Sequence, residues 1–237
     1  MERVALSSRP QDHRLFAALS PAAAARLLPF LEPVTWALRD GLSLPYALPE
    51  FWYFPTTAMI SLIQTLTEGV PAEMGVVGRE GVVGVGPFMG GGSMVSEALV
   101  QMAGQGFRLP AWQVTLEFRR GEGFQQVLLR YTQALLTQVS QTALCNRRHT
   151  ITQRMCRWLL LTLDRVPGDR VQITQEFLAQ MLAVRRPSVT DVVRRLDVEG
   201  IIAGGRGMIT ILDRPGVEAR VCECYTTVEK EYRRLLE

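Results

Sequence analysis

The sequence contains few of the side chains on which most enzyme active sites depend. Only two of its 237 residues are histidines, His13 and His149, and only four are cysteines. These residues form no Cys/His or Ser/His/Asp pattern typical of nucleophilic catalysis. Gly90-Gly-Gly92 is not a phosphate-binding loop, because no lysine follows it at the required spacing. An enzyme is therefore disfavoured, and activity on generic substrates would be needed to support that alternative.

Lysine and long apolar runs are also nearly missing. Lys230 is the only lysine, so arginine supplies nearly all of the positive charge. Arginine suits the forked hydrogen bonds that phosphates and guanine edges accept. No apolar run is long enough to span a bilayer, and Met1–Pro10 lacks the apolar segment of a secretory signal. The cysteines form no spaced disulfide framework. We therefore expect a cytoplasmic protein with reduced thiols and no membrane partner.

Positive charge is concentrated in one part of the chain. The net charge is only +3. The segment Arg147–Arg214, however, contains twelve arginines and seven acidic residues, a local excess of five positive charges. Such asymmetry indicates an anionic partner for this part of the chain, and nucleic acid is the obvious candidate.

The stretch Ile173–Leu196 predicts two amphipathic helices joined by a tight turn. Apolar residues recur on one face of each helix, at Phe177, Leu178, Met181 and Leu182 and then at Val189, Val192, Val193 and Leu196. The connection Ala183-Val-Arg185 is short enough to bring the helices together at a steep angle, as a helix-turn-helix requires. The outer face of the second helix is polar and arginine-rich, which favours insertion into a major groove.

A β-hairpin is predicted directly after the second helix. Gly200 favours the helix end, and two β-prone runs flank Gly204-Gly-Arg-Gly207. A hairpin in this position is typical of a wing, with Arg206 at its tip near the phosphate backbone. We therefore predict binding to double-stranded DNA through Thr174, Arg185, Arg186, Ser188, Thr190, Asp191, Arg194 and Arg206.

The N-terminal half predicts short helices followed by an antiparallel β-sandwich or jelly roll, which makes the fold class α+β. Asp12–Phe30 has a helical apolar stripe, with Ser20 as an N-cap before Pro21. Turn residues then separate short β-type runs at Trp52–Phe54, Met59–Leu66, Glu73–Val77, Gly81–Val85, Ala98–Met102 and Gly106–Leu109.

A long helix is predicted over Gly123–Asn146. One face has the alternating spacing of a coiled-coil seam, formed by Leu128, Tyr131, Leu135, Gln138, Thr142 and Cys145. We expect this seam to form a homodimer, and burial in that interface to account for Cys145. A second stripe, Leu129, Leu136 and Ala143, is expected to cover the β-domain. The alternative is a helix that packs only within its own subunit. Arg147–His149 reads as a hinge before another helix over Ile151–Asp164.

In this order of elements the chain resembles the Crp/Fnr family of bacterial transcription regulators. The resemblance is most specific in Ile173–Ile202, in Tyr53-Phe-Pro-Thr56 and in Met74–Gly84. It implies a homodimer on a pseudo-palindromic operator, with RNA polymerase as a partner if the protein is an activator. It also implies three regions: a sensor-like β-sandwich with N-terminal helices at residues 1–120, a dimerisation helix at 121–147, and a winged helix-turn-helix with a helical tail at 148–237.

The family's recognition residues are only partly present. Arg186 matches the arginine that reads guanine in the family, but Pro187 stands in place of the following glutamate and Asp191 in place of a second arginine. Thr174 and Ser188 match hydroxyls that contact phosphates. DNA binding is still implied, because phosphates supply most of the affinity. The family's operator sequence is not. Asp191 could accept from a cytosine amine, or it could pair with Arg194 or Arg195.

The family's effector sites do not carry over to this sequence. Gly81–Gly92 lacks the glycine-glutamate cassette of cyclic-nucleotide binders, and Glu97 lies where a phosphate-binding arginine is expected. Arg79 could be recruited, although Arg79-Glu80 is more typical of a solvated turn pair. We therefore expect no cyclic AMP binding and an unknown effector, if there is one. A cyclic-nucleotide-responsive regulator remains an alternative, as does a ligand-binding signalling module whose winged helix contacts only protein.

No metal site or cofactor is predicted. Iron–sulfur members of the family carry cysteines near the N-terminus, and this chain has none before Cys145. Haem ligation is equally unsupported, because His13 and His149 both lie outside the predicted β-domain. Cys222-Glu-Cys224 is too closely spaced for a tetrahedral zinc site by itself and lacks a second pair.

Overall fold

The computed structural model describes residues 8–237. The expectation that no secretory signal is present concerns mainly residues 1–7, which lie outside the described residues. The chain first forms four short helical segments: η1 (Pro10–Asp12), α1 (Arg14–Ala17), α2 (Pro21–Leu27) and η2 (Leu28–Phe30). Ser20 is the N-cap of α2, as predicted, and its side chain accepts a hydrogen bond of 3.3 Å from the Ala23 amide.

Two antiparallel sheets then form the predicted β-sandwich. Their strands are β1 (Glu32–Trp36), β2 (Gly41–Ser43), β3 (Phe51–Pro55), β4 (Met59–Thr65), β5 (Pro71–Val77), β6 (Glu97–Met102) and β7 (Gly104–Pro110). One sheet has the order β1-β7-β3 and the other β2-β6-β4-β5. The expected run Gly81–Val85 is not a strand. It contributes only one bridge, between Val83 and Tyr53.

Alternating side chains explain why these strands enclose a core. In β3, Trp52 and Phe54 are fully buried, whereas Phe51 and Tyr53 are half-buried. This period of two places one row of side chains between the sheets. Trp52 and Phe54 share that core with Leu128 and Tyr131 from the long helix, so the sandwich is closed partly by a helix from beyond it.

The C-terminal half is mainly helical. Its elements are α3 (Ala111–Arg119), α4 (Gly123–Arg148), α5 (Ile151–Leu163), β8 (Arg170–Val171), α6 (Gln175–Met181), α7 (Arg186–Val198), β9 (Ile202–Gly205), β10 (Met208–Ile211), α8 (Arg214–Glu218) and α9 (Glu223–Leu236). The expected break before α5 is present. His149 ends α4 in an extended conformation, and Thr150 forms a capping box with Gln153 at the start of α5.

The burial of the two apolar stripes of α4 differs from what we expected from the sequence. All six expected dimer residues are buried inside this subunit: Leu128, Tyr131, Leu135, Gln138, Thr142 and Cys145. Leu129 and Leu136, expected to cover the β-domain, are instead 50% and 56% exposed. The assignment of the six residues to a dimer seam is therefore wrong, because the sandwich and α9 already cover their face.

Gln138 shows why polar residues lie on this buried face. Its Oε1 accepts a hydrogen bond of 2.6 Å from the Val76 amide, and its Nε2 donates to the Val76 carbonyl at 3.2 Å. Val76 belongs to β5, an edge strand of its sheet. A strand edge carries unpaired backbone groups, so the Gln138 amide supplies the pairing that a further strand would provide.

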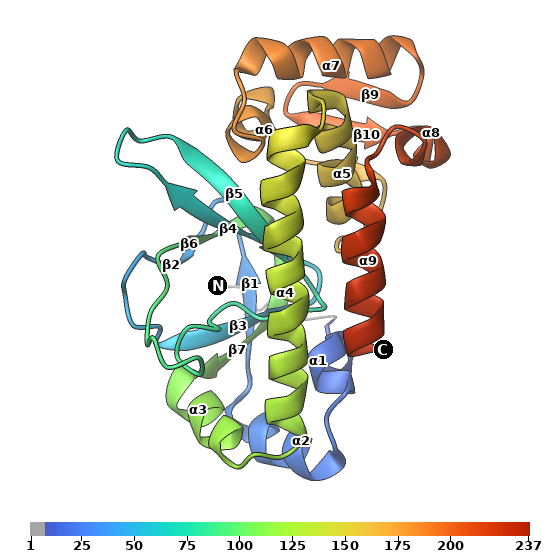
Figure 1. The fold of residues 1–237 in the computed structure, drawn as a ribbon. Coiled ribbons are helices and arrows are strands. Elements are labelled where there is room, and N and C mark those ends of the chain that lie inside the picture. Colours follow the sequence, from blue (N-terminus) through green and yellow to red (C-terminus); the bar gives the residue numbers. More distant parts are fainter. Residues whose placement is uncertain (1–7) are drawn as a thin grey trace, which may run out of the picture.

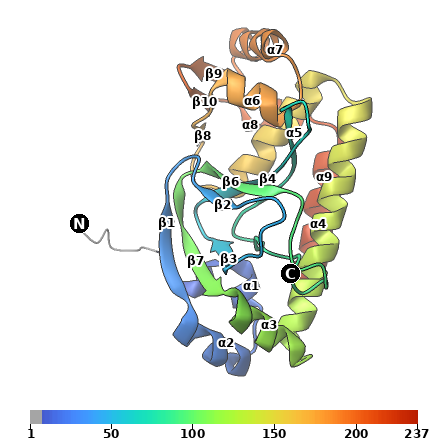
Figure 2. The same cartoon turned by 90° about the vertical axis from the view of Figure 1, so that its left-hand side faces the viewer.

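The C-terminal helix α9 lies beside α4 along much of its length (Figures 1 and 2). Val228, Tyr232 and Leu235 of α9 are buried in the core that contains the sandwich residues. The predicted helical tail is thus part of the body of the molecule. Among the described residues, no helix is both long and apolar enough to cross a membrane.

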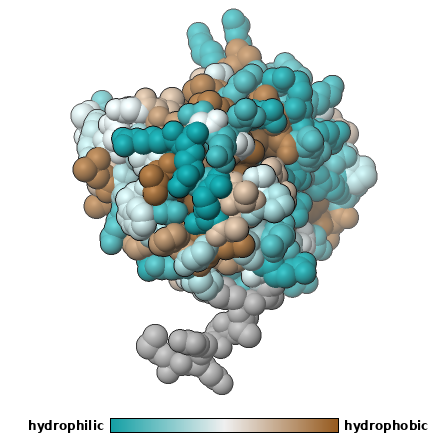
Figure 3. Space-filling model, turned by 90° about the horizontal axis from the view of Figure 1, so that it is seen from below, coloured by the Kyte–Doolittle hydropathy of each residue, from teal (hydrophilic) through white to brown (hydrophobic). Residues whose placement is uncertain are grey.

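The helix-turn-helix elements occupy the opposite end of the molecule from α2 and α3 (Figure 1). Viewed from the α2 and α3 end, the visible surface has apolar side chains in several separate places among hydrophilic ones (Figure 3). Among the exposed apolar side chains, Phe30 of η2 and Trp112 of α3 pack against each other, with their ring centroids 5.4 Å apart. Scattered apolar residues of this kind are ordinary on a protein surface.

Candidate nucleic-acid interface

Helix α6 and the turn after it establish the geometry of the interface. Thr174 is the N-cap of α6, and its hydroxyl accepts a hydrogen bond of 3.1 Å from the Phe177 amide. Leu178, Met181 and Leu182 are buried, as predicted, whereas Phe177 is half-buried. The turn then passes through Ala183, which has a positive φ of 48°. This left-handed residue reverses the chain within a few residues and allows α7 to cross α6 steeply.

Helix α7 buries its predicted apolar face and leaves its polar face outward. Val189, Val192, Val193 and Leu196 are all at most 6% exposed and pack in the core of this region. Gly200, with a positive φ of 70°, follows the helix end as predicted. The burial of one face therefore determines which side chains can reach a ligand.

The structure places the predicted DNA-binding residues on the outside of this unit. Arg185 and Arg186 begin α7, and α7 lies along the outer edge of the molecule (Figure 1). Of these eight residues only Ser188 is half-buried. The seven exposed residues are Thr174, Arg185, Arg186, Thr190, Asp191, Arg194 and Arg206. The described part of the chain does not cover this face.

Contacts among these side chains are weak or easily exchanged. Asp191 lies 3.8 Å from Arg194, in agreement with the pairing considered from the sequence. Arg186 lies 3.7 Å from Glu176 of α6. Both pairs are exposed on both sides, and such pairs contribute little free energy. The Thr190 hydroxyl donates to Gln175 at 2.7 Å. Breaking these two ion pairs so that Arg186 and Arg194 can contact a DNA duplex therefore costs little free energy.

The predicted hairpin is formed by β9 and β10, with Arg206 and Gly207 as its two-residue turn. Gly207 has a positive φ of 69°, a left-handed backbone conformation that glycine adopts without steric cost. The hairpin is tied to α7 at Gly204, whose amide donates to Asp197 at 3.0 Å. A Cβ at Gly204 would lie only 2.8 Å from the Val193 side chain. This close approach holds the wing against the recognition helix.

Sequence reasoning missed a basic residue that the fold brings to this region. Arg39, in the turn between β1 and β2, lies 5.6 Å from the centre of the Phe177 ring. Arg39 also lines a hollow of about 160 Å³ together with Thr174 and Arg206. Arg39 is distant in the sequence from the helix-turn-helix and isolated from other arginines. No local pattern therefore indicated that it would lie here.

The sandwich contains a small apolar cavity at the place where an effector could bind. It encloses about 40 Å³, and its lining includes Phe51, Tyr53, Leu62 and Met94 but no charged residue. Known small-molecule sites are several times larger, at roughly 300–1,000 Å³. The described cavity therefore has neither the space nor the cation that a cyclic nucleotide needs.

The prediction that Arg79 and Glu80 form a solvated pair is correct for Arg79 and wrong for Glu80. Arg79 is exposed, but Glu80 is buried and its carboxylate lies 2.6 Å from Arg165 Nε. Glu80 can be buried because Arg165, just beyond the end of α5, supplies a buried positive charge next to its carboxylate. Neither arginine reaches the apolar cavity lining.

Four residues that could hold a metal meet at the junction of α4 and α9. They are Cys145, His149, Cys222 and Cys224, and their ligand atoms all lie within 4.8 Å of one another. The expectation that Cys222-Glu-Cys224 lacks a second pair of candidate ligand residues is therefore wrong, because Cys145 and His149 at the end of α4 lie beside it. The only local signal was the spacing of Cys145 and His149, which places both on one side of a helix end.

This arrangement defines a DNA-binding unit of the winged helix-turn-helix class. Comparisons with known proteins identify the type of unit more closely. Residues 153–220 match the Crp-like helix-turn-helix domain. The HTH-type transcriptional regulator Cmr of Mycobacterium tuberculosis is 33% identical over 60 residues, which is 25% of this chain and 25% of that regulator. The match thus spans about a quarter of the length of the curated relative.

Solved structures share the fold of most of the chain. A Crp/Fnr-family transcriptional regulator from Eubacterium rectale has a TM-score of 0.67 at 15% identity, covering 86% of this chain and 96% of its own. FixK2 from Bradyrhizobium japonicum has a TM-score of 0.66 at 15% identity, covering 81% and 98%. Residues 153–220 therefore match a Crp-like helix-turn-helix domain, and most of the chain shares the fold of these solved structures.

Proposed function

We propose that this protein is a transcription regulator of the Crp/Fnr family that binds, as a homodimer, to a specific pseudo-palindromic operator in double-stranded DNA. The observation that carries the proposal is the exposed face of α7. That face presents Arg186, Thr190, Asp191 and Arg194 to solvent while its opposite face is buried. An amphipathic helix with this division can enter a major groove without rearrangement of its own core.

Within this interface we assign separate roles to base and phosphate contacts. Arg186 reads a base edge, since its guanidinium can form a forked pair with guanine. Arg206, on the wing, contacts the backbone, as do the hydroxyls of Thr174 and Ser188. The exposed pairs Arg186–Glu176 and Asp191–Arg194 open when DNA binds. Asp191 then accepts from a base amine or continues to orient Arg194.

The homodimer forms through the outer stripe of α4 rather than through the seam expected from the sequence. Leu129, Leu136 and Ala143 recur every seven residues along this face, and Leu144 next to them is 50% exposed. A seven-residue apolar repeat on an exposed helix face is suited to pairing with a second copy. Residues 121–147 then serve as the dimerisation helix between a sensor-like part at 1–120 and the DNA-binding part with its tail at 148–237.

We further propose that cyclic AMP is not the effector. The small uncharged cavity of the sandwich supports this, because a buried cyclic phosphate needs a charged hydrogen-bond donor. If the protein activates transcription, RNA polymerase is its further partner. Calorimetric titration with cyclic AMP and cyclic GMP tests the first statement, and saturable binding of either nucleotide would contradict it.

In vitro selection from a random DNA pool, with purified full chain and no added ligand, tests the proposed function. We expect enrichment of a two-fold symmetric site whose half-sites lie about one helical turn apart. Binding to a selected site should weaken steeply as salt rises, because phosphate contacts release counterions. Recovery of no sequence, together with salt-insensitive binding, would instead support a winged helix that contacts only protein.

A further inference from the structure

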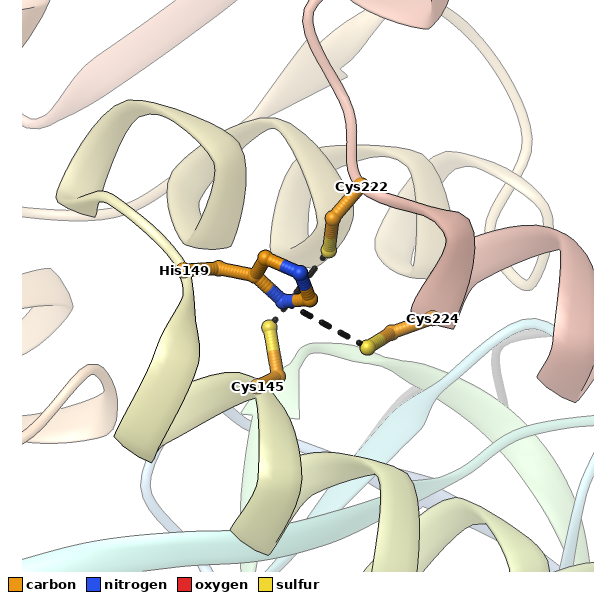
Figure 4. Close-up of side chains that lie close together, drawn as sticks. All are labelled: Cys145, His149, Cys222 and Cys224. Carbon is orange, nitrogen blue, oxygen red and sulfur yellow. Dashed lines mark hydrogen bonds between the residues drawn. The ribbon is translucent and has the colours of Figure 1, made fainter.

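The cluster of Cys145, His149, Cys222 and Cys224 has the composition of a structural metal site (Figure 4). Cys145 lies in the last turn of α4, and His149 is the C-cap of the same helix. Cys222 is the N-cap of α9, and Cys224 lies in its first turn. The extended backbone of Cys222 turns its thiol toward the same point as that of Cys224, so a two-residue spacing suffices here.

The distances agree with four ligands around one ion. Cys145 Sγ lies 3.5 Å from Cys222 Sγ, and Cys224 Sγ lies 3.6 Å from Nδ1 of His149. Tetrahedral coordination with ordinary Zn–S and Zn–N bonds separates two sulfurs by about 3.8 Å and a sulfur from a nitrogen by about 3.6 Å. Few side chains would have to move to accept an ion.

A neighbouring carboxylate orients the histidine for this role. His149 Nε2 lies 3.4 Å from the Glu223 carboxylate. A proton held on Nε2 leaves the lone pair of Nδ1 free, and Nδ1 is the nitrogen that faces the sulfurs. Histidines that bind metals usually donate their other ring nitrogen to such a partner. The Glu223 side chain is itself exposed, which gives the site a polar side through which an ion can enter.

From these observations we infer that Cys145, His149, Cys222 and Cys224 bind one Zn²⁺ ion in a closed tetrahedral site. Three thiolates and one imidazole favour zinc over harder cations such as Mg²⁺ or Ca²⁺. All four positions are filled by protein atoms, so the ion has no open position for a substrate, and its role is structural.

The position of the site gives the ion a particular mechanical role. The Crp-like helix-turn-helix domain, residues 153–220, lies between its two ligand pairs in the sequence. The chain enters this domain just after His149 and leaves it just before Cys222. One ion therefore joins both connecting segments and holds the domain in a defined orientation on α4 and α9.

Metal analysis of the purified full chain tests the site directly. Protein expressed in zinc-supplemented medium and freed of loose metal by gel filtration should contain about one zinc per chain. We expect the zinc content per chain to be at least about tenfold lower in the double variant Cys222→Ser/Cys224→Ser and in the single variant Cys145→Ser than in the unmodified chain. Cys156→Ser is the matched control, because Cys156 is equally buried but lies outside the cluster, and it should keep its zinc.

A second measurement on the unmodified chain decides the outcome even if the variants misfold. Apo protein titrated with Co²⁺ should develop the visible bands of a tetrahedral cobalt–thiolate site at one equivalent, and Zn²⁺ should abolish them. A folded wild-type chain without zinc and without these bands would overturn the proposal. So would zinc retained by the double variant, an iron chromophore, or a Cys145–Cys222 disulfide in protein prepared under reducing conditions. None of these readouts depends on DNA binding.

Discussion

Arg165 and Glu80 form a buried ion pair in which the Arg165 Nε lies 2.6 Å from the Glu80 carboxylate. Both side chains are at most 7% exposed. Arg165 also donates to the Leu161 carbonyl at 2.9 Å, and Glu80 accepts from the Gly78 amide at 3.3 Å. The charge of Glu80 raises the pKa of Arg165 against the opposing effect of burial. The pair joins the loop after β5 to the end of α5.

Removal of one partner of this pair should destabilise the protein strongly. Glu80→Gln leaves the Arg165 guanidinium buried without a counter-charge, and we expect a loss of about 3–5 kcal/mol in the free energy of unfolding. Urea denaturation measures it. Arg79→Gln, at the exposed neighbouring position, is the control and should change stability by less than about 0.5 kcal/mol. A Glu80→Gln variant as stable as this control would show that the pair contributes nothing.

His13 and Glu73 should give stability opposite dependences on pH. Burial lowers the pKa of His13 from 6.5 to about 4, against the raising effects of its Gly81 hydrogen bond and the Glu80 charge. Its contribution is complete above pH 6.5 and is lost as pH falls toward 4. Burial raises the pKa of Glu73 from 4.5 to about 7, against the Ser61 hydrogen bond and the Arg157 charge. Its contribution is complete below pH 4.5 and is lost as pH rises toward 7.

Each variant should therefore reveal the titration of the other group. In Glu73→Gln, stability should fall by about 3 kcal/mol as pH decreases through the His13 range, and in His13→Gln by a similar amount as pH increases through the Glu73 range. In the unmodified chain the two effects largely cancel between pH 4.5 and 6.5. Urea denaturation at a series of pH values provides the measurement. Parallel profiles for the two variants would contradict this account.

The two faces of α4 should respond differently to substitution. Leu136→Glu places a charge on the exposed stripe, and we expect it to convert the proposed dimer into a folded monomer. Leu128→Ala removes a fully buried side chain and should cost about 2–5 kcal/mol of stability without a change of assembly. Sedimentation equilibrium and thermal denaturation separate the two effects. If Leu136→Glu remained dimeric, the outer stripe would not be the interface.

Base and phosphate contacts can be distinguished on a selected operator. Arg186→Ala should cost about 1–3 kcal/mol and relax the preference at one base position, whereas Arg206→Ala should weaken binding to all sequences and reduce the salt slope by about one. Arg119→Ala, an exposed arginine of α3 far from the interface, is the control. Fluorescence anisotropy with matched and mismatched duplexes gives both quantities. Unchanged affinity in Arg186→Ala would refute its role in base reading.

Much of the fold could be predicted because its signals are local. The caps Ser20 and Thr174 lie next to the helices they begin. The apolar positions of α7 recur at helical spacing, and Gly207 marks the hairpin turn. Gly81–Val85 was wrongly predicted for the same reason: its local pattern resembles that of a strand, but the folded chain pairs it with another segment only through the bridge from Val83 to Tyr53.

The helices, most strands and the outward face of α7 follow from local sequence patterns, because side-chain periodicity and capping act over a few residues. Which stripe of α4 is buried depends on the folded molecule, since both stripes are apolar enough and the shape of the sandwich and α9 selects one. It alone also brought Cys145 to Cys222, which are 77 residues apart in the chain. Such long-range contacts depend on how the helices and strands pack, so no local sequence pattern predicts them.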